Sequence, residues 1–208
     1  MKKTLLLMSC KDGWESCEKE TKACVLALCK LGAHRVIESG SSDVAFARSR
    51  ALSFACEALR GELAECDVVL MVDDDMEFSP EMAQEVVDKC RELRRPTSAA
   101  YATITSKLAA TRWENGLWCC GLGLFAIPVP MLLELEARSE SFELGGRAYS
   151  QFTWSGADRG QWVNEDYRLC IELGGAVLLP LAAGHIKKVP IMPDDETIEA
   201  IAKGQVLT

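Results

Sequence analysis

The stretch that decides the fold is CDVVLMVDDDMEFSPEM, residues 66–82. Its first part, DVVLMV at 67–72, is a continuous apolar run, which is typical of a strand covered by helices on both faces. The run leads directly into three aspartates, Asp73, Asp74 and Asp75. Neighbouring carboxylates repel one another, and burial raises that cost. We therefore expect a positive charge, such as a bound dication, to lie among them.

Strand-like and helix-like patterns alternate on both sides of this stretch. The helix after the aspartates has a strong start signal, because Ser79 is followed by Pro80 at the first helical position. The elements expected in the first half are strand 4–10, helix 15–32, strand 34–39, helix 42–61, strand 67–72, helix 79–93 and strand 97–104. This alternation predicts an α/β fold with a Rossmann-like mixed sheet, mostly parallel and flanked by helices.

The second half is less regular. A cap at Asn164 and the pair Gly174-Gly175 bound one compact helix. The expected elements are strand material at 117–128, a short helix at 128–137, a loop-rich aromatic segment at 139–162, a helix at 164–175, a strand at 176–180 and a polar C-terminal helix. No repeat or linker divides the chain, so we interpret 1–208 as a single domain.

Composition narrows the class of protein. The 208 residues carry a net charge of −8, which argues against a nonspecific nucleic-acid coat protein. No run of 18 apolar residues is present, and we interpret the N-terminus as a first strand rather than a signal peptide. The ten cysteines form no C-x-x-C motif, so we expect reduced core thiols and a cytoplasmic protein.

Three polar motifs stand out in this framework. In parallel α/β sheets ligands bind at the carboxyl ends of strands, where Asp73-x-Asp75 can hold a dication that in turn holds a phosphate. An acidic loop that caps the next helix is the alternative. Glu165 and Asp166 open the second-half helix, where the helix dipole alone also favours acids. His185 follows a strand in AAGHIKK and could equally be structural.

The order of these pieces resembles the GT-A glycosyltransferases, particularly the small family 2-like members. The segments that carry the resemblance are AFARSRA (45–51), VVLMVDDDMEFSPEM (68–82), CGLGLFAIP (120–128) and NEDYRLCIELGGAVLLPLAAGHI (164–186). The resemblance implies a GT-A-type fold with a nucleotide-binding half at 1–105 and an acceptor and catalytic half at 106–208.

The resemblance also implies a metal and donor site. Asp73 and Asp75 match the D-x-D motif, which holds Mn²⁺ or Mg²⁺ and contacts the donor ribose, and Asp74 lies between them. His185 matches a late histidine that completes metal binding. Arg48 matches an arginine near the donor nucleotide. The implied cofactor is therefore Mn²⁺ or Mg²⁺, with a UDP-sugar as the favoured donor.

The catalytic half is implied in the same way. Gly121 and Gly123 match a glycine-rich segment beside the sugar and acceptor. Asp166 matches the base of inverting members, and Glu165 stands next to it. Lys107 falls where the chain crosses the site, so we count it hypothetically among the donor-binding residues.

The resulting expectation is a metal-dependent glycosyltransferase that moves a sugar from a nucleotide-diphosphate sugar to an acceptor hydroxyl. The acceptor could be a glycan, a protein, a small molecule or a modified DNA base. A nucleotidyltransferase on a related fold is one alternative, although its usual Gly-rich basic loop is poorly matched by SCKDGWES at 9–16. A non-catalytic nucleotide-sugar-binding module is the other.

Overall fold

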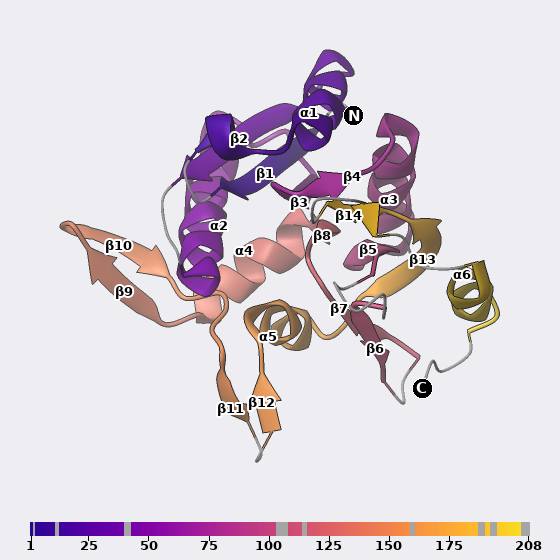
Figure 1. Ribbon diagram of the computed structural model, residues 1–208. Helices are drawn as coiled ribbons and strands as arrows, with labels where there is room; N and C mark the ends of the chain where they lie inside the picture. Colours follow the sequence, from indigo (N-terminus) through magenta and orange to yellow (C-terminus); the bar gives the residue numbers. More distant parts are fainter. Residues whose placement is uncertain are drawn as a thin grey trace.

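The computed structural model describes residues 1, 3–10, 13–39, 43–102, 108–113, 116–158, 161–186, 190–191 and 195–204. Its centre is a six-stranded sheet in the order β13-β5-β8-β3-β1-β2 (Figure 1). The strands are β1 Thr4–Cys10, β2 His34–Ser39, β3 Val68–Asp73, β5 Thr97–Ala100, β8 Leu124–Pro128 and β13 Val177–Ala182. Only β8 runs antiparallel to its neighbours in this sheet. The prediction of a mixed, mostly parallel sheet flanked by helices is confirmed.

Three helices begin at a residue whose side chain caps them. The side chains of Asp43, Ser79 and Asn164 each accept a hydrogen bond from a backbone N–H three residues on. The helices are α1 Lys19–Lys30, α2 Val44–Arg60, α3 Pro80–Leu93, α4 Val129–Arg138, α5 Glu165–Glu172 and α6 Asp195–Ala202, with a short 3₁₀ helix η1 at Trp14–Ser16.

Two layers of helices cover the sheet, which explains the unbroken apolar strands. Leu5 and Leu7 of β1 belong to a core with α2, α4 and α5. Leu6 and Met8 point the other way, into a core with α1 and α3. Successive residues of a strand face opposite sides, so both sides must be apolar when both are covered.

Some sequence predictions need correction. The helix predicted at 15–32 is the separate η1 turn followed by α1. The segment 139–162, predicted to be loop-rich, holds two antiparallel strand pairs, the first of which turns at Gly145-Gly146, and it is irregular at 151–155. The hairpin strands are β9 Ser141–Leu144 with β10 Arg147–Ser150, and β11 Gly156–Asp158 with β12 Gln161–Val163. Further short strands are β4 Met76–Glu77, β6 Ala110–Arg112, β7 Trp118–Cys120, β14 Gly184–Ile186 and β15 Pro190–Ile191.

The cysteines behave mostly as small core residues. All ten are free thiols, and eight are buried, whereas Cys24 and Cys29 are half-buried. None of the helices in the described ranges combines the length and apolar character that a membrane crossing needs.

Candidate active site

The turn after β3 brings two of the predicted metal ligands together. β3 ends at Asp73, and the chain turns at Asp74 and Asp75 into β4. β14 pairs with β4 so that His185 lies opposite Met76. The Nε2 atom of His185 is therefore 3.1 Å from Oδ2 of Asp75. A backbone hydrogen bond of 2.7 Å from the N–H of Ile186 in β14 to the carbonyl of Asp75 holds the turn in place.

A buried arginine links the two ends of the site. Arg48 of α2 is only 5% exposed. Its Nη2 lies 2.9 Å and 3.0 Å from the two carboxylate oxygens of Asp73. Its Nη1 is 3.2 Å from Oε1 of Glu165 and also donates to Oδ1 of Asp166. Of the three consecutive aspartates, Asp73 thus has a positive partner within the chain, the guanidinium of Arg48. Contact of Arg48 with a donor nucleotide stays a prediction.

The first turn of α5 carries the candidate base. The hydroxyl of Ser155 donates to Oε2 of Glu165 over 3.0 Å, and the hydroxyl of Thr153 donates to the Glu165 carbonyl. Burial raises the pKa of Asp166 to about 7. The charge of Arg48 lowers this pKa, whereas the carboxylates of Asp73 and Glu165 raise it. An aspartate with such a pKa accepts a proton more readily than an ordinary one.

Tyr101 is a site residue that the sequence reasoning missed. It directly follows β5, and its hydroxyl accepts a 3.3 Å hydrogen bond from the N–H of Gly123. Its ring meets the ring of His185 edge to face at 5.8 Å. Burial, followed by the charges of Asp166 and Asp73, raises the pKa of the phenol well above its usual value. Its position at the carboxyl end of a parallel strand was the available signal.

The two predicted glycines have a packing reason that the sequence did not reveal. A Cβ at Gly121 would lie 1.8 Å from the hydroxyl of Tyr101. A Cβ at Gly123 would lie 2.7 Å from the sulfur of Met76. Only glycine lets this backbone approach so closely. Their contact with a donor sugar or an acceptor stays a prediction.

Part of the predicted metal site fits a cation. Two ligands that each lie roughly 2.1 Å from an octahedral ion are about 3 Å apart. The 3.1 Å between Oδ2 of Asp75 and Nε2 of His185 is compatible with this spacing and is equally the length of a direct hydrogen bond between the two side chains. The carboxylate of Asp73 turns instead to Arg48, and the three side chains form no compact ligand group in the part of the chain that the structure describes. A metal ion would have to draw Asp73 partly away from the guanidinium.

The remaining predicted residues are placed as follows. The carbonyl of Asp74 accepts from the N–H of Glu18 and from the thiol of Cys17, which anchors the turn to the chain before α1. Lys107 lies outside the described residues. The compact ligand group found among the described residues is at the opposite, amino-terminal edge of the sheet and comprises His34, Glu65 and Cys66.

Comparison with known proteins supports the fold. No family model and no curated protein matches the chain. Among solved structures, the chain is similar to one described as the crystal structure of A197 from STIV, with a TM-score of 0.60 and 20% sequence identity. The match covers 94% of this chain and 95% of that chain. At this identity the likeness shows a shared fold and carries no residue roles.

Proposed function

We propose that this protein is a metal-dependent glycosyltransferase of the GT-A type, which moves a sugar from a nucleotide-diphosphate sugar to an acceptor hydroxyl. One observation carries the proposal. Arg48 joins Asp73, at the end of β3, to Asp166, in the first turn of α5, while Asp75 faces His185 beside them. These residues come from separate segments of the chain, and they are the ones that the family resemblance selects.

The charge balance of the site favours a cation and a diphosphate. Three carboxylates, those of Asp73, Glu165 and Asp166, contact the guanidinium of Arg48, and the carboxylate of Asp75 faces His185. Asp75 and His185 would hold Mn²⁺ or Mg²⁺ together with Asp73. When bound, the ion would stabilise the negative charge that develops on the leaving diphosphate.

The residues of the chain then account for the transfer step. The acceptor oxygen attacks the anomeric carbon of the sugar, and the bond from that carbon to the diphosphate breaks with its electron pair on the diphosphate. The acceptor proton passes to Asp166. Because Oδ1 of Asp166 is held by Arg48, Oδ2 is the oxygen that takes the proton. Base catalysis of this kind is typically worth ~10²–10⁴-fold.

The test is a mass-spectrometric screen of the purified protein against a panel of nucleotide sugars with Mn²⁺. We expect release of a nucleoside diphosphate, and loss of that release in chelator and in Asp75→Ala. Asp88→Ala is the matched control, because Asp88 is an exposed acid on α3. Release of pyrophosphate from a nucleoside triphosphate would favour a nucleotidyltransferase. Donor binding without turnover would favour the binding module.

A further inference from the structure

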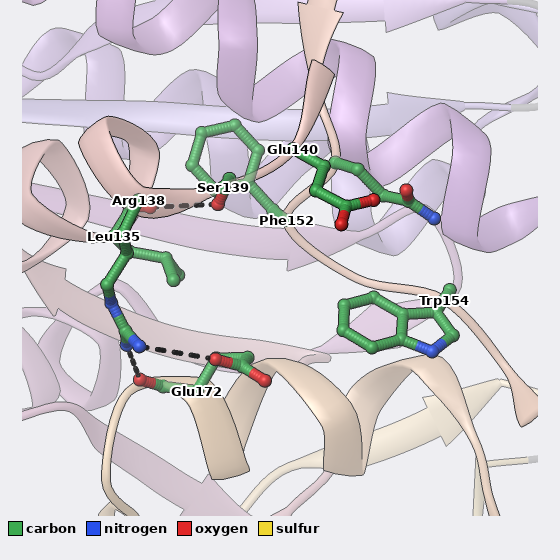
Figure 2. Close-up of a pocket in the computed structure, with 8 residues that line it drawn as sticks. Leu135, Arg138, Ser139, Glu140, Phe152, Trp154 and Glu172 are labelled. Carbon is green, nitrogen blue, oxygen red and sulfur yellow. Dashed lines mark hydrogen bonds and ion pairs between the residues drawn. The ribbon is translucent and has the colours of Figure 1, made fainter. Parts of the chain in front are cut away.

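Two cavities adjoin one another along residues 151–155, between β10 and β11. The first has a volume of about 330 Å³, and Figure 2 shows the side chains of Arg138, Phe152, Trp154 and Glu172 around it. The second has a volume of about 380 Å³. Gln151 and Trp154 line both cavities. Each cavity is within the range of roughly 300–1,000 Å³ that is common for small-molecule sites.

The second cavity is linked to Glu165, the residue next to the candidate base. Thr153 and Ser155 line it, and both also hold Glu165 through their hydroxyl groups. The first cavity reaches Glu172, the last residue of α5. The eight residues of α5 span roughly 10 Å at the rise of an α-helix. One cavity therefore lies near the first residue of α5 and the other beside its last residue, while Asp166 itself lines neither cavity. We call residues 151–155 with these two cavities the α5 groove.

Trp154 is the shared wall of the α5 groove. Its side chain is 37% exposed, unlike the neighbouring Phe152, which is fully buried. The guanidinium of Arg168 lies 4.6 Å from the centre of the indole ring, on the α5 side. This stacking holds the ring in one orientation at low entropic cost. A flat aromatic face is thus presented at the junction of the two cavities.

The lining selects a class of ligand. A sugar ring offers an apolar C–H face, which suits a fixed indole, and a rim of hydroxyl groups, which suits the amide of Gln151 and the carboxylates of Glu140 and Glu172. A nucleic acid strand would also stack on Trp154. Its phosphates, however, would meet Glu140 and, in the second cavity, Asp43, in a chain of net charge −8. The one arginine in the lining of the first cavity, Arg138, is already paired with Glu172.

We propose that the α5 groove is the acceptor site and holds a neutral glycan of two or more sugar units, which stacks on Trp154 and places its terminal hydroxyl at Asp166. This inference rests on the proposed function, because it names the acceptor class of the same transferase. It also assigns a binding role to Trp154 and Gln151 that the transfer chemistry itself does not require.

The experiment measures binding to a glycan array of neutral and acidic glycans, with a single-stranded DNA oligonucleotide as a further probe. Wild type is compared with Trp154→Ala, and the matched control is Trp162→Ala, because Trp162 of β12 is 74% exposed and lines neither cavity. We expect a neutral glycan of two or more units to bind wild type and the control. Trp154→Ala should bind it more than about tenfold more weakly, as loss of an aromatic anchor would cause.

A second variant guards against misfolding. Trp154→Phe keeps an aromatic face and should retain most of the glycan affinity, and a circular dichroism melt checks that each variant is folded. The inference is overturned if no glycan binds, if Trp154→Ala binds as well as wild type, or if only the oligonucleotide depends on Trp154. Turnover of a nucleotide sugar without any effect of Trp154 would defeat this inference alone. Trp154-dependent glycan binding without turnover would defeat the proposed function, and the α5 groove would then be a glycan-binding site but not an acceptor site.

Discussion

Replacing Arg48 with methionine should destabilise the protein far more than any surface charge change. The guanidinium is buried and contacts Asp73, Glu165 and Asp166. Removing one partner of a buried ion pair leaves uncompensated charge and costs about 3–5 kcal/mol. Methionine keeps most of the length of the side chain, so the loss reports charge more than packing.

The matched control lies on the same helix. Arg60 of α2 pairs with Glu136, but its side chain is 55% exposed. The Glu136 side chain is only 12% exposed, so Arg60→Met should cost more than the about 0–1 kcal/mol of a fully exposed pair. It should still cost less than Arg48→Met, which removes the partner of three carboxylates. Urea unfolding followed by circular dichroism, in chelator so that no metal replaces the lost charge, measures both variants.

The unfolding free energy lost in Arg48→Met, which we call its deficit, should also depend on pH. Arg48 lowers the pKa of Asp166 against the effect of burial, so its removal raises that pKa above about 7. A carboxyl with a raised folded-state pKa stabilises the fold below its unfolded pKa, and this stability is lost as pH rises through the folded pKa. Wild type and variant differ in the protonation of Asp166 only above about pH 7, so the deficit should grow as pH rises from about 7. A deficit that is independent of pH, or equal to that of Arg60→Met, would refute the reasoning.

Three further predictions follow from the site and the core. Asp166→Asn should lower the rate of sugar transfer by ~10²-fold or more while UDP affinity is retained. The rate of wild-type transfer should rise with pH through about 7, the pKa of Asp166. Unchanged turnover of the variant in a pH-rate assay would remove Asp166 from the mechanism. Gly121→Ala should lower the stability of the fold by ~1–3 kcal/mol, measured in a thermal melt, because its Cβ would lie 1.8 Å from the hydroxyl of Tyr101. Gly156→Ala, whose Cβ would have its nearest contact at 3.7 Å, should leave the stability unchanged. Thiol titration in denaturant without reductant should find all ten cysteines free, and several stable disulfides would contradict this.

The fold was largely predictable because its signals are local. The apolar strands and the caps at Asp43, Ser79 and Asn164 depend only on residues close in sequence. The Gly145-Gly146 turn between two short strand-like runs was also a local hairpin signal, which our prediction of a loop overlooked.

Most residues of the candidate site could be named from the sequence, but their contacts with one another could not. The bond from Arg48 to Asp166 spans 118 residues of sequence, and no local pattern encodes it. The same holds for Tyr101, whose ring fills the space that Gly121 leaves. Such contacts arise from packing between elements, which depends on three-dimensional shape rather than on spacing along the chain.

The central claim is that Asp75 and His185 hold a dication that binds a nucleotide diphosphate. A calorimetric titration of UDP, with Mn²⁺ and then with chelator, tests it most directly on wild type and His185→Ala. Loss of a metal ligand should weaken Mn²⁺-dependent UDP binding by more than about tenfold, and chelator should do the same to wild type. Equal UDP affinity with Mn²⁺ and with chelator would contradict the account.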